Sequence, residues 1–81
     1  MKAYTDGTKV YTVDSVCPGG WKHIMIYKLT DWQEKGENAP CWVVESNNPI
    51  YKVIKINSWA SEESAEKALI ACAKEFSWKE V

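Results

Sequence analysis

The feature that most constrains the fold of this 81-residue chain is a set of strand-like segments that are apolar on both faces. A β-strand with one face in water alternates polar and apolar residues, because successive side chains point to opposite faces of the sheet. Neither Ile24-Met25-Ile26-Tyr27 nor Trp42-Val43-Val44 alternates in this way. We therefore expect both faces of the sheet that contains these segments to need a cover.

β-Branched and aromatic residues mark the expected strands, and turn residues separate them. We predict four strands, over residues 10–16, 21–29, 41–45 and 50–56. Cys17-Pro18-Gly19-Gly20 is typical of a turn between the first two, and 46–49 is a turn cluster between the last two.

Two further segments are less regular. Asp6-Gly7 could form a turn between Tyr4 and Val10, which would add a short hairpin at the N-terminus. The connection 30–40 is polar apart from Trp32 and is long for a loop. Part of this connection could form a helical turn or extend the strands.

A helix is predicted near the C-terminus. Ser61 is a suitable N-cap, and Glu62 and Glu63 follow it in the first turn, where the helix dipole favours negative charge. The apolar residues recur at helical spacing and form one stripe: Ala65, Ala68, Leu69, Cys72 and Phe76. Ser77 ends the helix, and a tail or short terminal strand follows.

These elements predict one α+β domain over residues 1–81, an antiparallel meander of about four strands with the C-terminal helix packed on one face. The second face could be covered by the two terminal segments, which would bring Tyr4, Trp78 and Val81 over it. A strongly curled sheet or a second polypeptide could also close it. Monomers rarely leave large apolar patches open, and a sheet-to-sheet homodimer is the commonest symmetric solution.

Tryptophan is unusually frequent, with five copies in the chain. Trp42 is expected in the core and Trp59 under the start of the helix. Trp32 is expected either to fold back onto the sheet or to contact a partner, as interface tryptophans often do. The predicted contact surface consists of the aromatic sheet face and the 30–40 loop, with four candidate contact residues: Trp21, Tyr27, Trp32 and Tyr51.

Metal and anion sites find little support. Cys17, His23, Cys41 and Cys72 lack the closely spaced pairs that structural zinc sites use. Gly19-Gly20 precedes a strand rather than a helix, so its amides would not converge on a phosphate. We expect no metal and no cofactor.

Catalytic residues are also not apparent. His23 is the only histidine, and Asp14 and Ser15 lie across the predicted hairpin from it. Neighbouring residues of a strand point to opposite faces, so Asp14 and Ser15 cannot both address the same imidazole. We predict that the chain is not an enzyme.

Charge argues against nucleic acid as the partner. The net charge is −1 and all ten basic residues are lysine, so the arginine side chains that grip phosphate are missing. The alternative hypothesis is still a module that stacks single-stranded bases on aromatic and lysine side chains. Its residues would be Trp21, Lys22, Tyr27, Lys28, Tyr51 and Lys52.

Cysteine content and hydropathy indicate in which cellular compartment the protein is expected. Three cysteines are an odd number, and the first seven residues contain no apolar segment for export. The longest apolar run, 24–27, is too short to span a bilayer. We therefore predict a small, non-catalytic cytoplasmic protein that binds another protein as a regulator, inhibitor or accessory subunit. It would act as a homodimer, and mobile elements and phages are frequent sources of such proteins.

Overall fold

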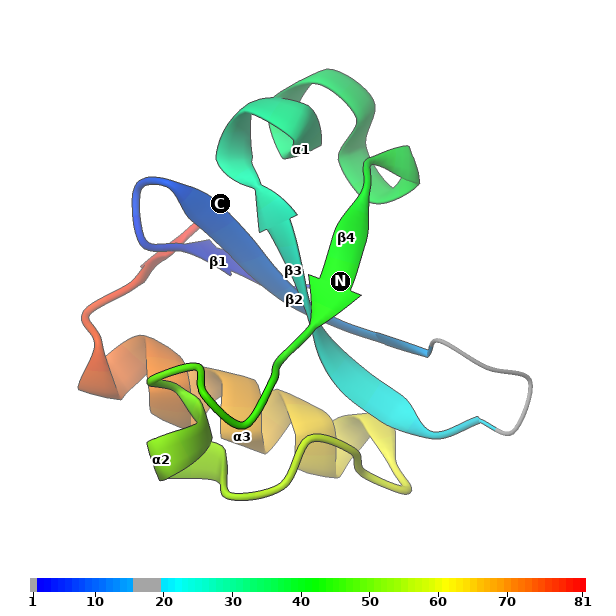
Figure 1. Cartoon of the computed structure of the whole chain (residues 1–81), viewed down its shortest axis with the longest axis vertical. Coiled ribbons are helices and arrows are strands. Elements are labelled where there is room, and N and C mark those ends of the chain that lie inside the picture. Colours follow the sequence, from blue (N-terminus) through cyan, green and yellow to red (C-terminus); the bar gives the residue numbers. More distant parts are fainter. Residues whose placement is uncertain (1, 16–19) are drawn as a thin grey trace.

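The computed structural model describes residues 2–15 and 20–81. This part of the chain forms one antiparallel sheet with helices around it (Figure 1). The strands, in the order β4-β3-β2-β1-β5, are β1 (Ala3–Thr5), β2 (Lys9–Ser15), β3 (Lys22–Lys28), β4 (Cys41–Val43) and β5 (Lys79–Glu80). The helices are α1 (Leu29–Lys35), the 3-10 helix η1 (Gly36–Asn38), α2 (Tyr51–Ile54) and α3 (Glu62–Glu75).

The predicted α+β class is confirmed, with the C-terminal helix α3 packed against the sheet. Ser61 caps α3 as predicted, because its hydroxyl oxygen accepts a hydrogen bond of 3.1 Å from the Ser64 amide. The strands predicted over 10–16 and 21–29 correspond to β2 and β3, which pair from Lys9↔Lys28 to Ser15↔Lys22. Most of the predicted turn between them lies outside the described residues.

Both ends of the chain join the sheet. β1 pairs with β2 across the turn at Asp6-Gly7, so the predicted N-terminal hairpin is confirmed. The segment after α3 forms the short terminal strand β5, which pairs with the outer side of β1. The sheet therefore has β5 at one edge and β4 at the other.

The predicted strand over 50–56 is wrong, because Tyr51–Ile54 forms the helix α2. Asn48 favours the helical turn: its side-chain oxygen accepts from the Ile50 amide at 3.0 Å, and its carbonyl accepts from Tyr51 at 2.9 Å. Ile50, Val53 and Ile54 also have the i, i+3, i+4 spacing of a helix. All three pack on the core, and α2 also contacts α3, so tertiary packing outweighs their β propensity.

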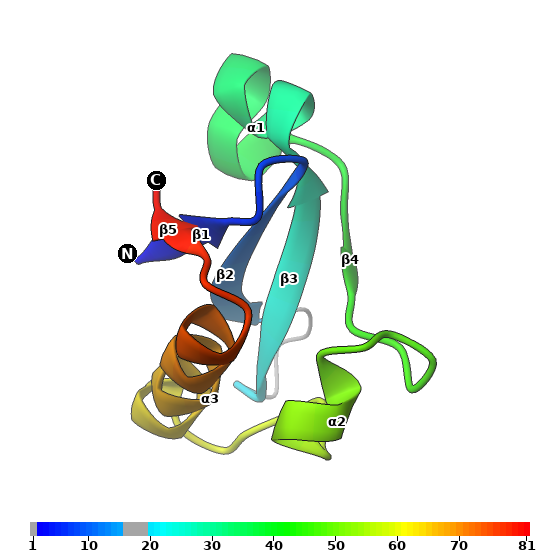
Figure 2. The same ribbon diagram turned by 90° about the vertical axis from the view of Figure 1, so that its left-hand side faces the viewer.

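The second sheet face is covered by the chain itself. α1 and η1, in the 29–39 connection, fold over one end of the sheet (Figure 2). Trp32 packs edge-on against Tyr27, with ring centroids 4.9 Å apart. The buried residues of this second cluster are Ala3, Val10, Met25, Tyr27 and Ala39. The open face that suggested a sheet-to-sheet homodimer is thus closed in the described part of the chain.

Candidate functional site

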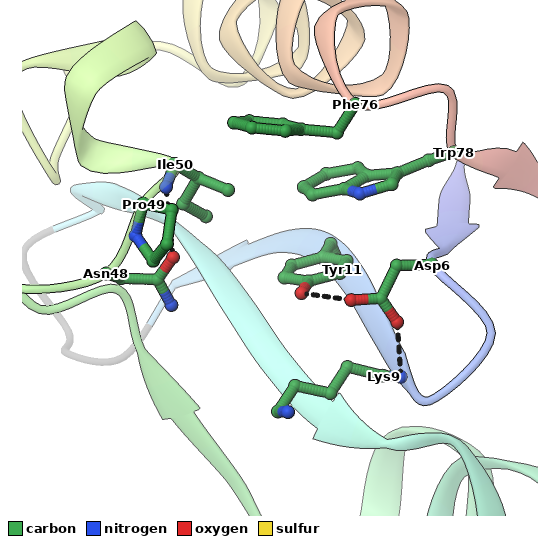
Figure 3. Close-up of a pocket in the computed structure, with 8 residues that line it drawn as sticks. All are labelled: Asp6, Lys9, Tyr11, Asn48, Pro49, Ile50, Phe76 and Trp78. Carbon is green, nitrogen blue, oxygen red and sulfur yellow. Dashed lines mark hydrogen bonds between the residues drawn. The ribbon is translucent and has the colours of Figure 1, made fainter.

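A hollow of about 380 Å³ opens beside the face of the sheet on which α3 packs (Figure 3). Its volume lies within the range of ligand-binding sites, roughly 300–1,000 Å³. The lining residues come from the β1–β2 hairpin, the segment before α2 and the end of α3: Asp6, Lys9, Tyr11, Asn48, Pro49, Ile50, Phe76 and Trp78. A second hollow of about 270 Å³ adjoins it and shares Asp6 and Phe76.

Three stacked aromatic rings form one wall of the hollow. The Trp78 indole lies on the Tyr11 phenol ring, with centroids 3.9 Å apart and planes 6° from parallel. Phe76 lies on the other side of Trp78 in Figure 3, with centroids 5.7 Å apart. Tyr11 is buried, whereas Phe76 is 38% exposed. The stack therefore extends from the core to the surface.

The end of α3 determines where Trp78 lies. The Trp78 amide donates a 2.9 Å hydrogen bond to the Ala73 carbonyl, and the Phe76 amide donates one to Cys72. Ser77 between them has φ of 57°, the left-handed conformation that closes a helix in a Schellman motif. This reversal brings the chain back over the sheet, so that Trp78 reaches Tyr11.

Asp6 fixes the hairpin side of the hollow. Its Oδ1 accepts from the Thr8 amide at 2.9 Å, the Lys9 amide at 2.8 Å and the Thr8 hydroxyl at 3.1 Å. Its Oδ2 accepts from the Tyr11 hydroxyl at 2.8 Å. Burial alone would raise the pKa of Asp6, but these hydrogen bonds hold it below its usual range. Burial and the bond to Asp6 raise the pKa of Tyr11, so this phenol stays protonated.

The opposite wall is the segment before α2. The hydrogen bond from the Ile50 amide to Asn48 Oδ1 closes a local turn. In this turn Pro49 and Ile50 face the hollow across from Trp78 (Figure 3). The hollow therefore has apolar groups on two sides and polar groups of Asp6, Lys9 and Asn48 around them.

The chemistry of these residues suits binding. The Asp6 carboxylate is engaged in four hydrogen bonds, and none of the described residues that line the hollow is a serine, cysteine or histidine. Among the residues that the structure describes, no three acidic, histidine or cysteine side chains are grouped to hold a metal ion. Within the same residues, no helix is long and apolar enough to cross a membrane.

Other polar and thiol groups lie elsewhere. His23 Nδ1 is buried without a hydrogen-bond partner among residues 2–15 and 20–81. Cys41 is exposed on β4, whereas Cys72 is a buried residue of α3, and burial raises its pKa to about 11. Burial, followed by the neighbouring Cys41 thiol, raises the pKa of Tyr27 to about 12.

The four predicted contact residues do not form one surface. Trp21 is 51% exposed, but Tyr27 is 1% exposed and has no surface to offer a partner. Trp32 packs on Tyr27 and covers the second sheet face, and Tyr51 packs on the core from α2. The sheet surface expected to stack nucleic-acid bases is likewise not formed, because Tyr27 is buried and Tyr51 lies outside the sheet.

The sequence carried partial signals for the hollow. The sequence predicts turns at both Asp6-Gly7 and Asn48-Pro49, and it predicts Phe76 on the apolar stripe of the helix. The aromatic stack was missed because it depends on the left-handed Ser77, a conformation that favours glycine and is not expected at serine.

Comparison of the chain with protein-family models, with curated proteins and with solved structures finds no match.

Proposed function

We propose that this chain is a small non-catalytic protein-binding domain that acts as a regulatory, inhibitory or accessory protein. Its binding surface is the hollow between the aromatic stack and the 48–50 segment. The observation that supports this proposal is the position of Phe76, a large apolar side chain 38% exposed at the rim of an aromatic-walled hollow. Clustered aromatic side chains in pockets contribute most of the binding energy at protein interfaces.

Selection from a displayed random-peptide library tests this function. Peptides enriched on the wild-type protein should lose binding to Phe76→Ala and keep binding to Trp21→Ala. Trp21 is the matched control because it is an exposed aromatic residue outside the lining of the hollow. Failure to enrich any peptide, or equal binding to both variants, would contradict the proposal.

The homodimer is retained as part of the proposal, but at the sheet edge. β4 is an edge strand without charged residues, and its Trp42, which the sequence predicts in the core, is instead 38% exposed. An edge strand can pair with a strand of another chain, and β4, although short, has none of the charged residues or prolines that oppose such pairing. We propose that a second copy pairs with β4.

Light scattering after gel filtration tests the dimer. The wild type should elute with the mass of two chains, and Trp42→Lys should elute as a monomer, because lysine on an edge strand opposes pairing. A wild-type monomer at all concentrations would remove the dimer and leave the peptide-binding hollow unaffected.

A further inference from the structure

The geometry points to an uncharged, proline-rich segment of a partner protein, in the polyproline II conformation, as the occupant of the hollow. This inference rests on the proposed function and names the chemistry of the partner. It follows from the hydrogen-bonding groups that line the hollow, the charges of those groups and the shape of the apolar walls.

The side-chain acceptors of the hollow are already engaged. Both carboxylate oxygens of Asp6 accept hydrogen bonds from the hairpin and from Tyr11. Asn48 Oδ1 accepts from the Ile50 amide. The backbone carbonyls of Asn48, Pro49 and Ile50 accept hydrogen bonds from amides of α2. A ligand that brings N–H donors would therefore find few partners here.

Three side-chain hydrogen-bond donors of the hollow, in contrast, are free to bind a ligand. Since Asn48 Oδ1 faces the Ile50 amide, its Nδ2 is the free end of the side chain (Figure 3). Neither this Nδ2 nor Lys9 Nζ nor Trp78 Nε1 donates to an acceptor in the described part of the chain. The hollow thus presents donors to whatever enters it.

The charges of the lining residues and the apolar walls of the hollow further restrict which ligand can bind. Asp6 and Lys9 are the charged residues of the lining, and their formal charges cancel, so a segment without charge is the complementary one. Trp78, Phe76, Pro49 and Ile50 offer apolar surface on two sides.

Proline-rich chains match these properties together. Proline keeps its carbonyl acceptor but has no amide N–H, so a proline segment leaves no donor unsatisfied against this lining. The polyproline II helix has no internal hydrogen bonds and is already ordered, and aromatic-lined grooves are its usual docking sites. An alanine segment would have the same carbonyls but would add N–H groups, for which the engaged side-chain acceptors of the hollow offer fewer partners.

Titration with acetylated, amidated hexaproline tests this, with the peptide Pro-Ala-Pro-Ala-Pro-Ala as its comparison. The readout is the chemical shift of the Trp78 indole N–H and the Asn48 side-chain amide. Hexaproline should shift both signals and bind about tenfold or more tightly than the alternating peptide, the ratio that corresponds to about one unsatisfied hydrogen bond.

Asn48→Asp is the sharpest variant, because it keeps the oxygen that accepts from Ile50 and removes the donor. Hexaproline should bind it about tenfold or more weakly, whereas Asn47→Asp, the same charge change on an exposed neighbour, should bind as the wild type does. If Asn48→Asp lowers the melting temperature, Lys9→Met provides a second donor deletion with the same expected direction.

Equal binding of both peptides, or no binding of hexaproline, would overturn the inference. So would equal affinities of the Asn48→Asp and Asn47→Asp variants. If library peptides without proline bind in a Phe76-dependent way while hexaproline does not, the protein-binding function stands and the proline-rich partner is wrong. If no peptide of either kind binds, both proposals fail.

Discussion

The indole of Trp78 lies flat on the phenol ring of Tyr11, with their centroids 3.9 Å apart. Trp78 comes from the segment after α3, and Tyr11 from the middle of β2, so the stack joins the C-terminal segment to the sheet. The same Tyr11 donates to Asp6 in the hairpin turn. One buried tyrosine therefore orients both the aromatic wall and the hairpin wall of the hollow.

Tyr11→Phe keeps the stacked ring and removes the hydroxyl that donates to Asp6. We expect the free energy of unfolding to fall by about 1 kcal/mol at neutral pH, which is less than a bond to a buried charged group contributes, because Asp6 is largely exposed. The measurement is urea denaturation, with Tyr4→Phe as the control. A loss equal to that of Tyr4→Phe would contradict the role assigned to this bond.

The pH dependence of unfolding reports on Asp6. Its folded pKa lies below the unfolded value of 3.8, so its contribution is fully present above that value. The contribution is lost as the pH falls through the folded pKa. The wild type should therefore lose more stability than Asp6→Asn between about pH 5 and the acid limit. Parallel curves for the two proteins in this range would count against the hydrogen-bonded carboxylate.

Ser77→Gly should stabilise the protein. Ser77 has φ of 57°, which costs an L-residue about 1 kcal/mol relative to glycine, offset in part by the greater entropy of glycine when unfolded. We expect a gain of about 0.5 kcal/mol, measured by chemical denaturation. Ser77→Ala retains the Cβ and should show no gain, so equal stability of the two variants would contradict the assigned conformation.

Trp32→Ala tests whether Trp32 covers the second face of the sheet or serves as a contact residue for a partner. Because Trp32 packs on Tyr27, its removal should lower the free energy of unfolding by about 2–4 kcal/mol. Trp21→Ala, in which the lost side chain is 51% exposed, should change it by less than about 0.5 kcal/mol. A stable, folded Trp32→Ala would mean that this tryptophan does not close the second sheet face.

The secondary structure predicted from the sequence is correct where local chemistry decides the structure. Ser61 with two following glutamates predicted the start of α3, and the β-branched run 10–16 predicted β2. The prediction failed at 50–56, where Ile50, Val53 and Ile54 suit both a strand and a helical turn. The local Asn48 turn favours the helix, and packing against the core and α3, which depends on residues distant in the sequence, decides between the two.

The cover of the second sheet face shows the same limit. Trp32 lies in a polar connection, and the sequence predicts that it either folds back onto the sheet or contacts a partner. Only tertiary contacts distinguish these two alternatives. The structure places it against Tyr27, so the need for an outside cover disappears. The hollow was not predicted because its walls come from three separated segments: the hairpin turn, 48–50 and 76–78.

The most direct test of the central claim is to locate a library-selected peptide on the protein by amide chemical-shift mapping. The account predicts that the shifts centre on Asp6, the 48–50 segment, Phe76 and the Trp78 indole N–H, and that Phe76→Ala abolishes them. Shifts centred on Trp21 or on β4, with the hollow unperturbed, would show that the binding surface lies elsewhere.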